Sequence, residues 1–223
     1  MAALGSGGTL AVEGLAVLGD CLGQLGRWDE ALALGAESRA IAAKTSLPWD
    51  SHIASYHLAR TLLTRGDAAA AEPLIEEGLA LGLRGGLAAV TTMHRALLAG
   101  ARLLADQPQE AVELLDLAIA DCDAMRLQWA HAHAAVLKAE ACLALGRDDA
   151  PTVATEALEL AQAHGYRAFE AAAQRLYAGC IISADPRVAG ERLRAADEIA
   201  ERLALPLERM AIAGLAARIG LTA

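Results

Sequence analysis

The residues of this chain that could do chemistry lie at spacings that fit neither a metal site nor a local catalytic site. His131 and His133 are two residues apart, so on a helix they point to different faces and cannot hold one metal ion as an i, i+4 pair could. His52 and His57 are five residues apart, which is also poor geometry for chelation. We therefore expect no metal site.

Catalytic motifs are also missing from the sequence. The run GxxxxGK[ST] that binds nucleotide phosphates is absent, and the glycine-rich stretches at 5–8 and 82–86 lack the strand-to-helix context that such a loop needs. No Ser-His-acid or Cys-His arrangement can be assembled from local spacing, although such groups can also meet in the fold. We expect no cofactor, no catalytic residue and no enzymatic activity.

Composition favours helices and disfavours nucleic-acid binding. Hydrophobic residues make up 55% of the 223 residues, alanine and leucine dominate, and aromatic residues reach only 3%. The net charge of −9 argues against direct binding of nucleic acid, because phosphate contacts need concentrated Lys and Arg. No apolar run reaches the roughly 18–20 uncharged residues of a membrane span.

The cysteines and the N-terminus indicate a cytoplasmic protein. Cys21, Cys122, Cys142 and Cys180 are scattered in apolar helical patterns without a CxxC pair, where cysteine behaves as a small hydrophobe. The first residues lack the basic stretch of a secretion signal. We expect a flexible lead-in at 1–8 and one helical repeat domain at 9–223.

A period of 40 residues runs through the chain. Turn signals between apolar-periodic segments occur at Gly26, Gly66, Asp106 and Gly146, and a further one at Asp185 comes one residue early. Each break therefore separates two helices of a hairpin, which we call the A helix (before the break) and the B helix (after it). Prolines such as Pro48 mark a second kind of break, between hairpins, and suit the first turn of a helix.

Small residues recur seven positions before each break, at Gly19, Ala59, Ala99 and Ala139, and let two antiparallel helices approach closely. The sequence thus predicts an all-α protein of about five helical hairpins plus a terminal helix, without strands, and the resemblance described next implies that they stack into a right-handed α-solenoid. The expected helices span 9–25, 28–45, 50–65, 68–82, 88–105, 109–125, 129–145, 150–164, 167–183, 187–204 and 207–219.

This pattern resembles the tetratricopeptide repeat (TPR) family. The 40-residue period is longer than that family's usual 34 and is similar to the variant in the C-terminal sensor domains of large bacterial transcription activators of the MalT type. Gly35 occupies the position at which the family has an aromatic residue in helix B. The third to fifth repeats match the family's residue pattern poorly. The residues that carry the resemblance are Leu18, Gly19, Leu22, Gly26, Trp28 and Ala31.

The resemblance implies that the A helices line a concave groove. In the first repeat it places four residues on this inner surface, namely Glu13, Ala16, Val17 and Asp20. Such a surface would be mostly apolar and would suit an amphipathic peptide, a helix or a small apolar effector. The alternative is a tightly wound solenoid whose inner face packs on itself. The residues expected to bind a ligand or partner are Tyr56, His57, Arg60, Met93, Leu97, His133, Leu137, Glu140 and Tyr177.

We therefore expect a non-catalytic interaction or sensor module, part of a bacterial transcription regulator, that binds a partner protein, a peptide or an effector. The alternative is a small hydrophobic-ligand-binding or catalytic α-solenoid, with Tyr56, His57 and Arg60 as its polar site. The terminal helix at 207–219 carries apolar residues around much of its circumference, among them Met210 and Leu215. This surface predicts either a continuation of the chain or a homodimer through the C-terminal helix.

Overall fold

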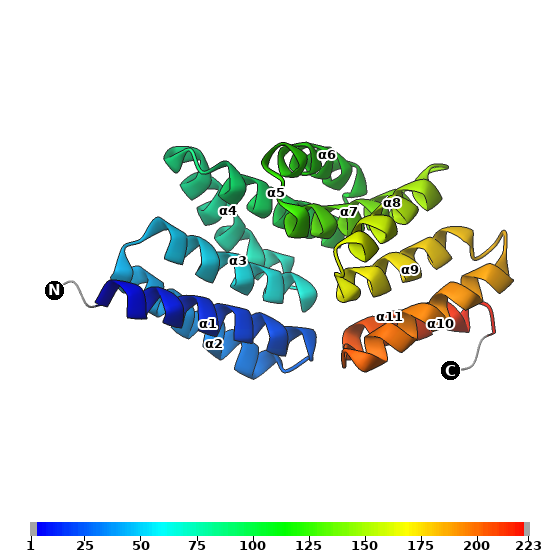
Figure 1. The fold of residues 1–223 in the computed structure, drawn as a ribbon, viewed down its shortest axis with the longest axis horizontal. Coiled ribbons are helices and arrows are strands. Elements are labelled where there is room, and N and C mark those ends of the chain that lie inside the picture. The colour runs from blue at the N-terminus through cyan, green and yellow to red at the C-terminus, as the bar shows by residue number, and fades with distance from the viewer. Residues whose placement is uncertain (1–3, 221–223) are drawn as a thin grey trace. The chain divides into compact units, whose positions relative to one another are not determined.

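A computed structural model describes the backbone of residues 4–220 and the side chains of residues 8–220. These residues form eleven helices and no strand (Figure 1), so the predicted all-α architecture is confirmed. The first helix begins at Leu4, within the predicted lead-in, while residues 1–3 lie outside the described residues. The helices are α1 (Leu4–Gln24), α2 (Trp28–Thr45), α3 (Pro48–Thr64), α4 (Ala68–Gly85), α5 (Ala88–Leu104), α6 (Pro108–Met125), α7 (Gln128–Ala144), α8 (Ala150–Ala163), α9 (Arg167–Ile181), α10 (Pro186–Arg202) and α11 (Pro206–Ala217).

The predicted breaks of the 40-residue period lie where one helix ends and the next begins. Gly26, Gly66 and Gly146 have φ of +74°, +86° and +63°, a left-handed conformation that ends a helix and that glycine adopts without steric cost. Asp106 takes the same conformation at the third break, with φ of +57°. At the last break the Asp185 carboxylate caps α10 by accepting a hydrogen bond from the Val188 amide, at 3.0 Å.

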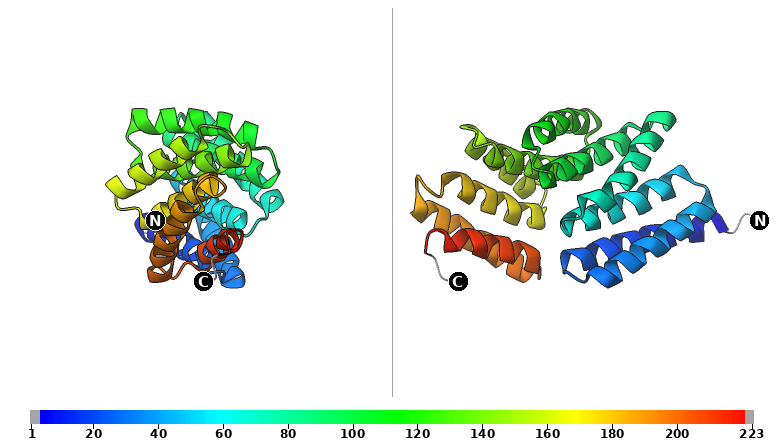
Figure 2. Two further views of the ribbon diagram at one scale, coloured as in Figure 1. Left: turned by 90° about the vertical axis from the view of Figure 1, so that its right-hand side faces the viewer. Right: turned by 180° about the vertical axis from the view of Figure 1, so that it is seen from behind.

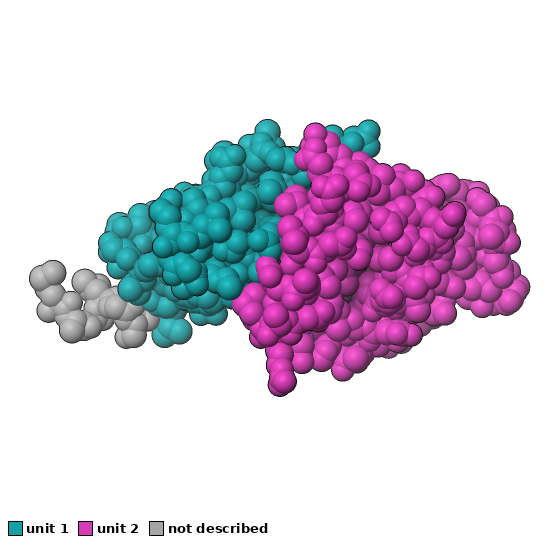
Figure 3. All heavy atoms as spheres, turned by 90° about the horizontal axis from the view of Figure 1, so that it is seen from above, with its two compact units in different colours: residues 1–106 teal, residues 107–223 magenta. Residues whose placement is uncertain are grey.

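The chain divides into two compact units, residues 1–106 and 107–223 (Figure 3). In the first unit α1 packs on α2 and α3, and α3 packs on α4 and α5; in the second α7 packs on α6, α8 and α9, and α10 packs on α9 and α11. The two helices of the α1–α2 hairpin lie side by side, as the views from the front (Figure 1) and from behind (Figure 2) both show. No described helix is long and apolar enough to cross a membrane.

Small residues bring these helices close together. Ala59 and Ala99 are fully buried, and a Cβ at Gly19 would stand 3.0 Å from the Ala31 carbonyl oxygen across the α1–α2 hairpin. The core of the second unit is likewise rich in alanine, with Ala139, Ala154 and others around Leu176. The predicted column of small residues therefore lies between helices, as close helix packing requires.

Candidate functional site

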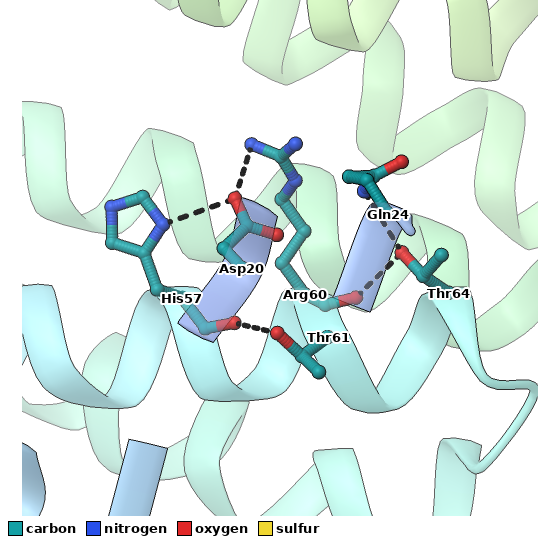
Figure 4. A network of polar contacts seen from close by, with 6 residues as sticks. All are labelled: Asp20, Gln24, His57, Arg60, Thr61 and Thr64. Atoms are coloured by element: carbon teal, nitrogen blue, oxygen red, sulfur yellow. Dashed lines mark hydrogen bonds and ion pairs between the residues drawn. The ribbon is translucent and has the colours of Figure 1, made fainter. Parts of the chain in front are cut away.

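A polar network joins α1 and α3 (Figure 4). One carboxylate oxygen of Asp20, Oδ2, lies 3.1 Å from Nη1 of Arg60 and 3.3 Å from Nδ1 of His57. The side chain of Asp20 is only 7% exposed, that of Arg60 18% and that of His57 15%. Because the carboxylate is buried beside a guanidinium, the ion pair offsets much of the cost of taking Asp20 out of water.

The network follows the 40-residue period. Asp20 and Arg60 are one period apart, and so are Gln24 and Thr64, whose side chains form a hydrogen bond of 3.4 Å. Residues at equivalent positions of successive A helices thus stand next to each other in this unit. This column could have been found from the sequence by stepping 40 residues back from Arg60, which leads to Asp20, a residue assigned to the inner surface but not to the binding set.

The hydroxyl groups of the network already have hydrogen-bond acceptors. Thr61 Oγ1 and Thr64 Oγ1 donate to the backbone carbonyls of His57 and Arg60, at 3.0 and 2.9 Å, so both hydroxyls are already engaged one turn back on their own helix. The second oxygen of Asp20, Oδ1, is buried without a hydrogen-bond partner among the described residues. Among residues 8–220, whose side chains the structure describes, no group of three His, Cys, Asp or Glu side chains is arranged to hold a metal ion.

Tyr56 does not belong to this surface, contrary to the expectation. Its side chain is 1% exposed and packs in the core, with ring centroids 5.8 Å from both His52 and His94. One step along a helix rotates the side chain by about 100°, so His57 can face Asp20 of α1 while Tyr56 faces His94 of the next hairpin. Leu97 is also only 1% exposed, so neither residue can contact a partner without moving.

The core around Tyr56 contains two buried histidines: His52, considered above only as a poor metal ligand, and His94, which sequence reasoning did not single out. The rings of His52 and His94 are 5.1 Å apart between centroids, and both residues are fully buried. Burial, together with the charges that His94 and His57 would carry, lowers the pKa of His52 from 6.5 to about 3. Burial also lowers the pKa of His94, although Nδ1 contacts the Val90 carbonyl at 3.0 Å. Both imidazoles are therefore neutral in the folded protein at neutral pH.

In the second unit the expected residues lie on α7 and α9 and are accessible to different degrees. His133, Leu137 and Tyr177 are half-buried, and Glu140 is exposed. His133 stacks on Phe169, at 5.8 Å between centroids, and contacts Trp129 at 5.7 Å. These rings form a partly exposed aromatic cluster in a chain that has few aromatic residues.

Charged groups border this face of the second unit. The guanidinium of Arg192 lies over the Tyr177 ring, 5.2 Å from its centroid. Arg175 pairs with Glu208 of α11 at 2.6 Å. Met93, the remaining expected residue, is half-buried on α5 of the first unit. The expected residues therefore form separate polar and aromatic groups, each within one unit.

Comparison with known proteins identifies the fold. No family model and no curated protein matches the chain. The chain is similar to the crystal structure of a kinesin light chain-type protein of Podospora anserina with nearly identical TPR-like repeats: the TM-score is 0.55 at 21% identity, over 94% of this chain and 96% of that one. A single-substitution variant of such a protein gives 0.58 at 22% identity, over 85% and 94%.

These likenesses extend over most of each chain, and together with the eleven tandem helices they show that the chain has a TPR-like repeat fold. The similarity to MalT-type sensor domains stays a prediction.

Proposed function

We propose that this chain is a non-catalytic interaction module that binds a partner protein or peptide on the inner faces of its A helices, in the cytoplasm and as part of a bacterial transcription regulator. Stacked hairpins supply extended surfaces for such binding without chemistry of their own. The TPR-like fold supports this role by analogy with other helical repeat proteins.

The observation that carries the proposal is that side chains of successive A helices meet within a unit and stay partly accessible. Asp20 and Arg60 show that side chains one period apart are neighbours in the first unit. In the second unit Leu137 and Tyr177 lie on the packed helices α7 and α9, and both are half-buried. Each unit thus offers partly accessible side chains from its A helices, His57 and Arg60 in the first unit and Leu137 and Tyr177 in the second, to which an extended or helical partner can bind.

The two units offer different chemistry to a partner. His57 and Arg60 provide polar groups, while His133, Leu137 and Tyr177 provide aromatic and apolar contacts. The catalytic alternative has less support, because Tyr56 is buried and the threonine hydroxyls of the network donate to the backbone.

A site-specific photo-cross-linker tests this proposal in cells. We expect benzoylphenylalanine at position 137 to form a discrete adduct, while the same group at Leu117 does not, because Leu117 is 58% exposed on the B helix α6. With the cross-linked protein identified, Leu137→Glu should weaken its binding at least tenfold and Leu117→Glu should leave it unchanged. Equal adducts at both positions, or binding insensitive to Leu137→Glu, would move the interface away from the inner face of the second unit.

A further inference from the structure

One side of the last helix, α11, is exposed where the earlier A helices are buried. The fifth residues of α3, α5, α7 and α9 are each 1% exposed or less, whereas Met210, the fifth residue of α11, is 71% exposed; the buried residues are His52, Thr92, Ala132 and Ala171. The side of α11 that carries Met210 is therefore open.

On this side a hollow lies between α10 and α11. Ile212 is buried against Leu193 and Ala196 of α10, and the cavity beside this contact has a volume of about 450 Å³. Leu193 and Ile212, at 2% and 4% exposure, form its inner wall, while the exposed Met210 and Ala213 border its opening. The apolar side chains that line it are Leu193, Pro206, Met210, Ile212, Ala213 and Ala216.

Two arginines line this pocket, and only one of them is in an ion pair with a described residue. Arg209 is engaged, with Nε 2.8 Å from Asp197 Oδ1 and Nη1 3.6 Å from Glu201 Oε1. Arg194 is exposed, lines the same pocket, and makes no ion pair or hydrogen bond with another described residue. The pocket therefore combines an apolar wall with one guanidinium that has no acidic partner in the described chain.

We propose that this pocket binds an aliphatic carboxylate, with the tail between α10 and α11 and the carboxylate on Arg194. The volume falls in the roughly 300–1,000 Å³ range of small-molecule sites. Guanidinium and carboxylate form two parallel hydrogen bonds, which gives Arg194 a preference for this head group over a neutral or cationic one. The flexible thioether of Met210 can adapt to the tail. This binding is independent of the partner surface on α7 and α9.

Calorimetric titration of the full chain with hexanoate, octanoate and decanoate, below their micelle concentrations, tests the tail. We expect saturable one-to-one binding whose Kd falls about fourfold for each added methylene, because burial of a CH₂ contributes about 0.8 kcal/mol. Decyltrimethylammonium and 1-decanol test the head group and should bind at least tenfold more weakly than decanoate. Absence of saturable binding, or equal affinity for the three ten-carbon probes, overturns the proposal.

Variants locate the site. Arg194→Gln should weaken decanoate binding about tenfold or more and leave 1-decanol binding unchanged, since only the ionic hydrogen bonds are lost. Arg202→Gln is the matched control, because Arg202 is exposed on the same helix outside the pocket, and it should change neither affinity. Ala213→Phe should weaken binding of both probes by filling an accessible part of the pocket. Decanoate affinity that is unchanged by Arg194→Gln or Ala213→Phe refutes the assignment.

Light scattering separates this ligand from a second copy of the chain. The pocket predicts a monomer that stays monomeric after Met210→Glu. A dimer that Met210→Glu dissociates would mean that another protomer covers the pocket, and the carboxylate site would then be rejected.

Discussion

The buried histidines of the first unit make its stability depend on pH in a way that can be measured. Burial holds the pKa of His52 near 3 in the folded protein, against 6.5 in the unfolded chain. Neither ring nitrogen of His52 has a hydrogen-bond partner among the described residues, so a proton on this ring would be uncompensated. The unfolded chain therefore binds the additional proton, and stability is fully present above pH 6.5 and falls as the pH drops toward 3.

The expected size follows from the linkage between protonation and folding. At about 1.4 kcal/mol for each pH unit, His52 alone should lower the free energy of unfolding by roughly 2 kcal/mol between pH 7 and pH 5. His94 should add to the loss, because burial also lowers its pKa, although Glu77 counteracts part of this shift. Glu140 opposes part of this loss, because desolvation by the surrounding protein raises its pKa, so that the folded chain binds this proton more readily than the unfolded chain.

Urea unfolding followed by circular dichroism at pH 7, 6 and 5 measures the effect. In His52→Leu the loss of stability between pH 7 and pH 5 should be smaller than in the parent by about 2 kcal/mol, whatever the absolute stability of the variant. His164→Gln is the control, since this histidine is exposed and meets water in both states. If the pH dependence is the same in His52→Leu as in the parent, the buried histidine does not govern it.

The remaining predictions concern packing, the ion pair and the helical content. A Cβ at Gly78 would stand 1.9 Å from Nε2 of His94, so Gly78→Ala should cost about 1–3 kcal/mol, whereas Gly14→Ala, with open space around it, should stabilise by about 0.5–1 kcal/mol. A melting temperature that rises in both variants would contradict this helix packing. Arg60→Glu should cost on the order of 3 kcal/mol, because it removes the guanidinium from the buried Asp20 and places a second carboxylate beside it; an unaltered melting temperature would show that the ion pair adds no stability. Far-ultraviolet circular dichroism should show an almost entirely helical protein, and strand content above about a fifth would refute the fold.

The helical repeat could be predicted from the sequence because its signals are local. Glycines at Gly26, Gly66 and Gly146 end helices through backbone conformations that depend on a few neighbouring residues, and the 3.6-residue apolar pattern marks what lies between them. The predicted and observed boundaries accordingly differ by a few residues, most at the start of α1 and least at these breaks.

Which of two neighbouring residues on an A helix is buried in the core could be decided only from the tertiary structure. Tyr56 and His57 are adjacent in the sequence, and their roles separate only because α3 is rotated so that Tyr56 meets His94 of α5 while His57 meets Asp20 of α1. A helical period limits a side chain to a sector of the helix, but the burial of that sector depends on the helices packed around it. For the same reason Arg60→Glu, harmless at an open surface, becomes costly once Asp20 is known to be its neighbour.

The sequence by itself determined the helices, their order and the 40-residue step that relates them, since turn chemistry and apolar periodicity act over a few residues. Only the tertiary structure decided that Asp20 pairs with Arg60, that two neutral histidines stand in the core, and that a pocket with Arg194 opens beside α11. These features depend on how far each helix is rotated about its axis and how closely it packs. Those quantities come from the summed contacts of many side chains, and no short stretch of the chain encodes them.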